Sequence, residues 1–144
     1  MPLITRELNV ISRCGMQFRG RALKGTDLTP AQSPYLLHIC HRPGMSQEEL
    51  AKALHVDRSN AARQLAHLES AGYVRREPLA EDRRVLAVHP TSKARGIVAR
   101  LRAINAQWHD YLTQDMTPEE REQLEDLMEK MRRRAILWEQ EDRE

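Results

Sequence analysis

The stretch from residue 46 to residue 89 constrains the fold most, because its local signals predict two short helices followed by two strands. Ser46 and Glu49 have the spacing of a capping box, in which each side chain satisfies the other residue's backbone amide. Asp57 is placed to cap the second helix, and Gly72 can supply the left-handed residue that ends it. Two strands are expected, at 73–77 and 84–89, and a polar connection at 78–83 joins them. This order predicts a helix-turn-helix followed by an antiparallel hairpin.

The second of these helices, residues 57–71, has a narrow apolar stripe. The stripe repeats at helical spacing and consists of Ala61, Leu65 and Leu68. Much of the remaining surface carries groups that pair with base edges: Arg63 can form a bidentate contact with guanine, and Asn60 and Gln64 can pair with adenine. Positions 59–67 contain no carboxylate that would repel phosphate. The pattern predicts that this helix reads duplex DNA.

The expected hairpin concentrates four guanidinium groups beside one short connection. They belong to Arg75, Arg76, Arg83 and Arg84. A narrow minor groove has a deep negative potential that attracts arginine side chains, so we expect the hairpin tip to enter the minor groove. Asp82 is unsuited to a phosphate contact, and we expect it to pair with an arginine and fix the shape of the tip.

The predicted DNA-contacting set also includes the start of the first short helix, whose backbone amides can hold a phosphate. The full set is Ser46, Gln47, Arg58, Ser59, Asn60, Arg63, Gln64, His67, Arg75, Arg76, Asp82, Arg83 and Arg84. The charge distribution agrees with a polyanion partner, since residues 1–112 carry 17 basic and 10 acidic groups whereas residues 113–144 carry 6 and 11. A winged module that presents the same face to an acidic protein is the alternative.

Long amphipathic segments flank the helix-turn-helix in the sequence. One helix is expected over residues 3–22, and another from Thr29 to about residue 41, with a slight bend at Pro34. Two more are expected after Pro90 and from Thr117 to near the end of the chain. The apolar stripes of the flanking helices are too extensive for a small winged domain to cover, which favours a homodimer over a monomeric three-layer pack.

These residues resemble the MarR (multiple antibiotic resistance regulator) family of dimeric winged-helix repressors and activators. The segments that carry the resemblance are LTPAQ at 28–32, SQEELA at 46–51, VDRSNAAR at 56–63, LESAGYVRR at 68–76 and DRR at 82–84. The resemblance implies a recognition helix at 57–71, a wing at 73–89, and a dimer built from the N-terminal helix and the last two helices. After the wing the family usually continues with Leu-Thr and a nearby Gly, whereas this chain keeps only Thr91.

We therefore expect a mainly α fold with a small antiparallel β-wing. The expected domains are an N-terminal dimerisation helix (1–28), a winged helix-turn-helix DNA-binding domain (29–90) and C-terminal dimerisation helices (91–144). The expected function is that of a sequence-specific repressor that binds double-stranded DNA as a homodimer. Its operator would be a pseudo-palindrome with half-sites about 10 base pairs apart. A small ligand would modulate the DNA affinity.

Three sensing sites are open at this point. By analogy with the fold, a small aromatic or phenolic effector is expected in a pocket lined by Tyr35, His38, Trp108 and Tyr111. Cys14 could sense oxidants, although a small interface residue is the simpler interpretation. His38, Cys40, His41 and His109 carry metal-ligating groups. Because His38 and Cys40 point about 200° apart on a helix, they cannot easily share an ion, and we expect no metal site and no cofactor.

The sequence also argues against an enzyme, a membrane protein and a secreted protein. It contains no glycine-rich phosphate loop, no nucleophile–base pairing and no closed metal motif. Its longest apolar runs are a few residues, far short of the roughly 20 that span a bilayer. Two cysteines and no visible secretory signal are typical of a cytoplasmic protein.

Overall fold

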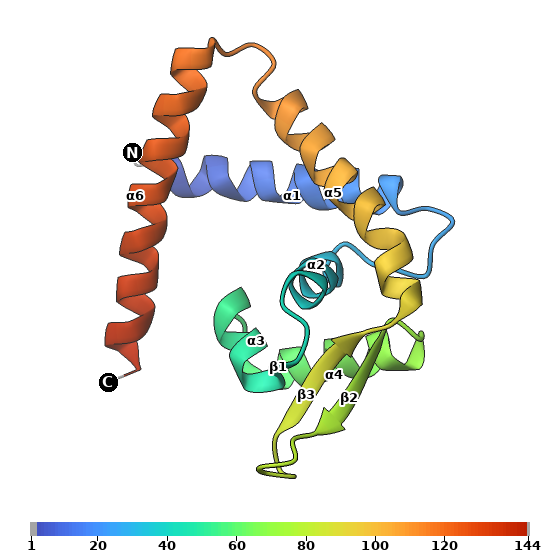
Figure 1. Cartoon of the computed structure of the whole chain (residues 1–144). Helices are drawn as coiled ribbons and strands as arrows, with labels where there is room; N and C mark the ends of the chain where they lie inside the picture. Colours follow the sequence, from blue (N-terminus) through green and yellow to red (C-terminus); the bar gives the residue numbers. More distant parts are fainter. Residues whose placement is uncertain (1–2, 144) are drawn as a thin grey trace. The chain divides into compact units, whose positions relative to one another are not determined.

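The computed structural model describes residues 3–143, and it confirms a mainly α fold with a small antiparallel sheet (Figure 1). The elements in chain order are α1 (Ile4–Ala22), α2 (Ser33–His41), β1 (Met45–Ser46), α3 (Gln47–Leu54), α4 (Arg58–Ser70), β2 (Val74–Pro78), β3 (Leu86–Pro90), α5 (Ser92–Leu112) and α6 (Pro118–Asp142). The chain divides into two compact units, residues 1–108 and 109–144, with the boundary near the end of α5.

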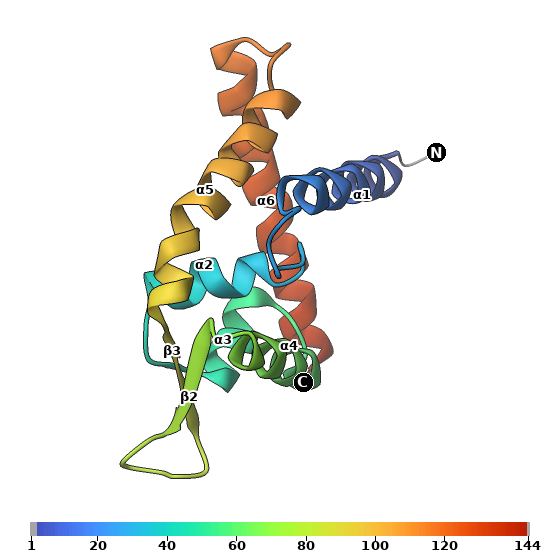
Figure 2. The same cartoon turned by 90° about the vertical axis from the view of Figure 1, so that its right-hand side faces the viewer.

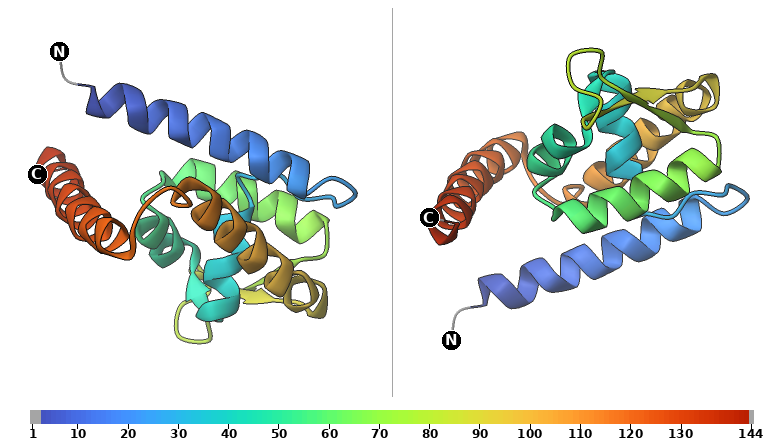
Figure 3. Two further views of the ribbon diagram at one scale, coloured as in Figure 1. Left: turned by 90° about the horizontal axis from the view of Figure 1, so that it is seen from above. Right: turned by 90° about the horizontal axis from the view of Figure 1, so that it is seen from below.

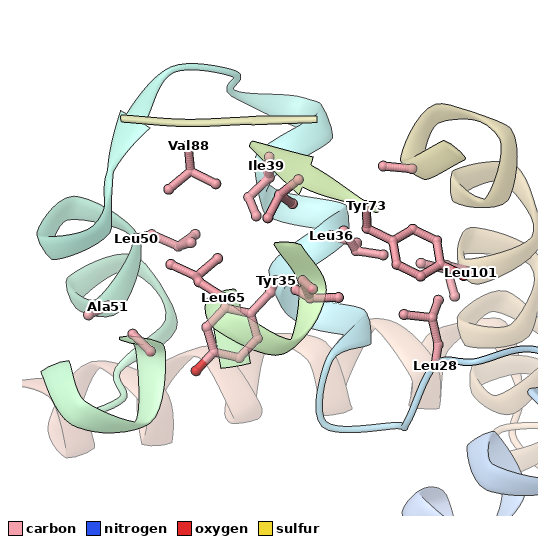
Figure 4. Close-up of a cluster of buried hydrophobic side chains, with 14 of the residues drawn as sticks. Leu28, Tyr35, Leu36, Ile39, Leu50, Ala51, Leu65, Tyr73, Val88 and Leu101 are labelled. Atoms are coloured by element: carbon pink, nitrogen blue, oxygen red, sulfur yellow. The ribbon is translucent and has the colours of Figure 1, made fainter. Parts of the chain in front are cut away.

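The core of the first unit is built mainly from aliphatic side chains of α2, α3, α4 and the sheet (Figure 4). Leu36, Ile39, Leu50, Leu65 and Val88 are fully buried in this cluster. Each such side chain contributes about 1.5–3 kcal/mol when it is removed from water. The cluster therefore fixes the two helices of the helix-turn-helix against α2 and the base of the hairpin.

The sheet has three antiparallel strands in the order β1-β3-β2, so the predicted hairpin β2–β3 is present and a third strand joins it. Val88 of β3 lies opposite Arg76 on one side and Met45 on the other. The strand β1 was not predicted, because two residues are too few to show a period-two pattern. Gly44 directs the chain into it with a φ of +88°, and its amide donates to the Val88 carbonyl at 2.9 Å.

The helix α2 begins later than the sequence suggested. The expected start at Thr29 and the bend at Pro34 are wrong: a turn precedes the helix, which starts at Ser33 with Pro34 in its first turn. Because proline has no N–H, Pro34 cannot donate to the carbonyl four residues earlier, and the regular pattern forms only after it. Gln32 Oε1 nevertheless accepts from the Thr29 amide at 3.0 Å, which fixes the turn before the helix.

Within the first unit α1 packs across α5: the two helices cross in Figure 1, and in Figure 2 the C-terminal end of α1 points toward α5. The rings of Phe18 and Trp108 stack with centroids 5.2 Å apart. Arg19 Nε donates to Asn105 Oδ1 at 3.1 Å, which ties the same two helices together. Gly15 is the buried residue of α1. Much of the remaining apolar surface of this helix is exposed in the single chain, including Ile4, Leu8 and Ile11.

The second unit consists mainly of α6, whose start was predicted correctly. Thr117 Oγ1 accepts from the Glu120 amide at 3.1 Å, and Pro118 is the first helical residue. The apolar side chains of α6 lie at the surface of the single chain, including Leu124, Leu127 and Met131, and no described residue of this helix is buried. None of the helices within residues 3–143 combines the length and apolarity needed to cross a bilayer.

Candidate nucleic-acid interface

The helix α4 turns its polar side outward because its apolar stripe is buried. Ala61, Leu65 and Leu68 are at most 1 % exposed, as the spacing predicted. Viewed from below, α4 and the β2–β3 hairpin both face the viewer (Figure 3, right). The predicted DNA-contacting residues of this helix are all exposed or half-buried: Arg58, Ser59, Asn60, Arg63, Gln64 and His67.

An aspartate fixes the first turn of α4. Asp57 Oδ1 accepts from the Asn60 amide at 2.7 Å and from the Ser59 hydroxyl at 3.2 Å. These hydrogen bonds, the Asn60 amide first, hold the pKa of Asp57 below its usual value. The cap therefore stays ionised at neutral pH, and the turn that carries Ser59 and Asn60 is fixed in advance of any contact.

The start of α3 lies beside the start of α4. The predicted capping box is present: Ser46 Oγ accepts from the Glu49 amide at 3.0 Å, and Glu49 Oε2 accepts from the Ser46 amide at 3.2 Å. Arg58 donates to the Glu48 carboxylate, which links the two helices and partly neutralises that acid. A hollow opens between these helix starts and the hairpin, lined by Ser46, Gln47, Glu48, Arg58, Arg84, Val85 and Leu86.

The tip of the hairpin has the arrangement expected for Asp82. Its Oδ1 accepts from the Arg84 amide at 3.1 Å and from Arg84 Nε at 3.0 Å, while Oδ2 accepts from Arg84 Nη2 at 3.2 Å. The Arg84 hydrogen bonds keep the pKa of Asp82 below its usual value. Because the Arg84 side chain is still 90 % exposed, the aspartate orients the guanidinium without covering it.

The arginines of the hairpin are not equivalent. The Arg76 side chain is only 20 % exposed, and its guanidinium donates to Glu69 Oε1 at 3.1 Å and to Gln47 Oε1 at 2.7 Å. The Arg76 amide also donates to Glu69 Oε2 at 3.0 Å. Arg76 and Gln47, both predicted to contact DNA, are therefore engaged in joining β2, α4 and α3. The hydrogen bonds to Arg76 lower the pKa of Glu69.

The remaining hairpin arginines lie at the surface. Arg75 Nη1 donates to Glu77 Oε1 at 2.9 Å, with more than half of each side chain exposed. Arg83 is exposed at the tip. Sequence reasoning missed the acids that hold these cations. Glu77 could have been found, because residues two apart on a strand share a face, but the partnership of Glu69 with Arg76 depends on how α4 meets β2.

The candidate effector residues of the first unit, Tyr35, His38 and Trp108, have different surroundings. Tyr35 is buried in the core, where Figure 4 shows it beneath Leu65. Trp108 stacks on Phe18, and Tyr111 belongs to the second unit and is 64 % exposed. His38 does line a hollow between α2, α3 and α5, together with Pro34, Leu37, His41, Leu54 and Arg102.

The candidate sensing residues are also separated. Cys14 is exposed on α1, whereas Cys40 is half-buried, and burial raises the pKa of its thiol. Within residues 3–143, no group of three His, Cys, Asp or Glu side chains is placed to hold a metal ion.

Comparison with known proteins gives consistent relationships. Residues 26–85 match the MarR family model. The HTH-type transcriptional regulator YybA of Bacillus subtilis, itself uncharacterized, is 31 % identical over 130 residues, which cover 90 % of this chain and 87 % of that protein. A crystal structure of MarR superposes with a TM-score of 0.86 at 33 % identity, covering 98 % of this chain and 95 % of that one. A mutant MarR from E. coli, solved with operator DNA, has a TM-score of 0.82 at 30 % identity, with 91 % and 94 % covered.

A relative matched over most of its length, a family model that spans the helix-turn-helix and β2, and solved structures with the same fold all agree. This relative and these solved structures are transcription regulators and not enzymes. The chain belongs to the MarR family of winged helix-turn-helix transcription regulators.

Proposed function

We propose that two copies of this chain bind a pseudo-palindromic operator, each with α4 in the major groove and the β2–β3 hairpin in the adjacent minor groove. The observation that carries the proposal is the outward polar face of α4 beside an exposed, aspartate-oriented Arg84. The similarity to a MarR protein solved with operator DNA supports the same partner. Repression, by occlusion of a promoter, is the regulatory outcome that we expect.

The contacts are divided by chemistry. Arg63, Asn60 and Gln64 are proposed to read base edges, since guanidinium and amide groups form bidentate pairs with guanine and adenine. The proposed phosphate and groove contacts come from the helix starts and the exposed hairpin arginines; they are Ser46, Arg58, Ser59, His67, Arg75, Arg83 and Arg84. We assign Gln47, Arg76 and Asp82 to positioning. Arg76 is mostly covered and bonded to Gln47 and Glu69, and the Asp82 carboxylate orients Arg84.

The proposed homodimer uses apolar faces that the single chain leaves exposed. In the first unit these belong to α1 and include Ile4, Val10 and Ile11. In the second unit they belong to α6, where Leu127, Met128 and Trp138 are exposed. Large contiguous apolar surface is rare on a soluble monomer, so each face is best explained by a partner copy. A two-fold axis would then repeat α4 at the pitch of the duplex.

We also propose an effector site in the hollow between α2, α3 and α5. Pro34, Leu37 and Leu54 supply apolar walls, and Arg102 with the imidazoles of His38 and His41 can bind a carboxylate or a phenolate. A small aromatic acid fits this combination. Because the hollow touches both the helix-turn-helix and α5, a ligand that fits one relative arrangement better would shift the DNA affinity.

The test is fluorescence anisotropy on duplexes enriched by the parent protein from a random library of about 30 base pairs, three helical turns. Arg63→Ala is expected to weaken binding to the enriched duplex about tenfold or more, with little change on a generic duplex. Lys52→Ala is the matched control, because Lys52 is a surface cation of α3 outside the proposed contact set. Equal binding of the Arg63→Ala variant and the parent would refute the assignment of α4 as the reading helix.

If the parent protein binds no duplex at low salt, the proposed DNA-binding function is refuted. A stable complex with an acidic protein in the same sample would then support the alternative winged protein-interaction module.

A further inference from the structure

The turn that ends α4 is held by the start of α5. Gly72 has a φ of +83°, and its carbonyl accepts from Thr91 Oγ1 at 2.6 Å. On one side of it the Ala71 carbonyl accepts from Lys93 Nζ at 2.6 Å, and on the other the Tyr73 carbonyl accepts from the Thr91 amide at 2.9 Å. Three successive carbonyls between the recognition helix and the wing are thus bonded to two residues at the beginning of α5.

The loop between α1 and α2 joins the same point. Asp27 accepts from the Tyr73 hydroxyl through Oδ1 and from Lys93 Nζ, 2.7 Å away, through Oδ2. The Lys93 ammonium also lies 4.3 Å from the centroid of the Tyr73 ring. The loop is itself fixed, because Thr26 Oγ1 donates to the Leu23 carbonyl at 2.6 Å and accepts from the Leu28 amide at 3.2 Å.

Asp27 and Tyr73 keep their protonation states around neutral pH. The hydrogen bonds from Lys93 and then Tyr73 lower the pKa of Asp27, so its carboxylate is ionised. Burial, followed by the hydrogen bond to Asp27, raises the pKa of Tyr73 to about 12, so the phenol keeps its proton. Asp27 and Lys93 are about half exposed, and exposed ion pairs add little to folding stability. The cluster is therefore better suited to fixing geometry than to holding the fold together.

We propose that Asp27, Tyr73 and Lys93 form a positioning cluster that fixes the direction of α4 relative to α5, and thereby the half-site spacing that the protein accepts. The inference rests on the proposed DNA-binding function. It assigns the three residues an indirect role, since none of them belongs to the proposed contact set. If α5 helps to form the dimer, the angle between α4 and α5 at this cluster decides how far apart the two recognition helices of the dimer lie.

The first test measures the distance between α4 and α5 in the absence of DNA. Nitroxide labels at Ala66→Cys on α4 and Ala103→Cys on α5, both exposed positions of the first unit, would be placed in a Cys14→Ser, Cys40→Ala background. The labelled protein is diluted with unlabelled protein so that distances within one chain dominate. Asp27→Asn and Lys93→Met are expected to broaden or shift the distance distribution relative to the parent. Lys93→Arg, which keeps the charge, is expected to preserve it, as is the control Lys24→Met in the same loop.

The second test measures spacing on the enriched duplex and on versions with one base pair added or removed between half-sites. The two cluster variants are expected to lose about tenfold in affinity at the parent's preferred spacing and to discriminate less between spacings, with generic-duplex affinity unchanged. The double variant should lose no more than either single one, because the residues act as a unit.

An unchanged distance distribution in Asp27→Asn and Lys93→Met would overturn the proposal, whether or not the parent binds DNA. So would a uniform loss of affinity on every duplex, which would indicate a merely structural role. A parent that binds no duplex would instead refute the proposed function, and the label distances would still decide the positioning role.

Discussion

Arginine residues that look alike in the sequence carry different tasks in the folded chain. Arg76 bonds to Glu69 and Gln47 and is mostly covered, whereas Arg84 is held by Asp82 and remains almost fully exposed. The difference comes from the surroundings of each guanidinium and not from its own chemistry. A cation whose donors are already engaged by the protein positions its neighbours, and one that is oriented but uncovered is available to a phosphate.

This contrast predicts opposite phenotypes for two alanine variants. Arg76→Ala should lower the free energy of unfolding by about 1 kcal/mol, because Glu69 and Gln47 lose their partner, and should leave the salt dependence of DNA binding nearly unchanged. Arg84→Ala should leave stability nearly unchanged and reduce the slope of log affinity against log salt by about 1. Urea titrations and anisotropy across a salt series measure the two quantities. A reduced salt slope in Arg76→Ala, with parental stability, would contradict this division.

A second prediction concerns the Tyr35 hydroxyl. This oxygen is buried and has no hydrogen-bond partner within the described residues, and burial raises the pKa of the phenol. Removing an unpaired polar atom is neutral or favourable, so Tyr35→Phe should leave the free energy of unfolding unchanged or raise it by up to about 1 kcal/mol. Tyr73→Phe is the matched control: it loses the hydrogen bond to Asp27 and should be the less stable of the two. Urea unfolding in which Tyr35→Phe is clearly destabilised would show that the hydroxyl has a buried partner.

Secondary-structure elements were predictable where their signals are local. The capping residues Ser46, Asp57 and Thr117 each accept the hydrogen bond that their sequence context indicated. The hairpin was found because a glycine stop, a basic run and an apolar run follow one another. The strand β1 and the late start of α2 were missed, since one depends on pairing with a distant strand and the other on a single absent N–H.

The candidate site was predictable to the same extent. A helix with a narrow apolar stripe reveals its polar face without a structure, so the outward side of α4 was predictable from spacing; its DNA contacts stay a prediction. The covering of Arg76 and the cluster around Asp27 were not identified, because both join residues far apart in the chain. Contacts of this kind depend on how elements pack, which periodicity does not encode.

The crossing of α1 and α5 depends on the small size of Gly15. A methyl group there would lie 3.1 Å from Nε1 of Trp108 and 3.0 Å from Nη1 of Arg19. The arginine can move, but the indole is stacked on Phe18. Gly15→Ala should therefore separate the helices slightly and cost about 1–3 kcal/mol. In a Trp138→Phe background, the fluorescence emission of Trp108 should shift to longer wavelength as its indole becomes more exposed to water. Unchanged emission together with an unchanged melting temperature would show that a methyl group fits between α1 and α5 without separating them.

At the scale of the whole molecule, a monomer leaves apolar faces on α1 and on α6 without cover. Each unit has one such face, and the proposed homodimer would cover both with a second copy of the chain. The proposed function needs two recognition helices, and the exposed faces supply the surface through which a second copy can bring the second helix.

The proposed dimer predicts that one charge introduced on the apolar face of α6 prevents dimerisation while each chain still folds. Leu127→Glu, at a position 58 % exposed in the single chain, should shift the protein from dimer to monomer in sedimentation velocity. The enriched duplex should then be bound far more weakly, because only one half-site is engaged at a time. Glu122→Lys, on the opposite side of the helix, is the charge-changing control and should remain dimeric. A dimeric Leu127→Glu protein would place the interface elsewhere.

The central claim is that two copies present two α4 helices to one side of B-form DNA, and hydroxyl-radical footprinting on the enriched duplex tests it most directly. The account predicts two protected patches on one face of the duplex, centred about 10 base pairs apart and related by two-fold symmetry, with protection extending into the flanking minor grooves. A single patch, or patches on opposite faces of the duplex, would contradict it.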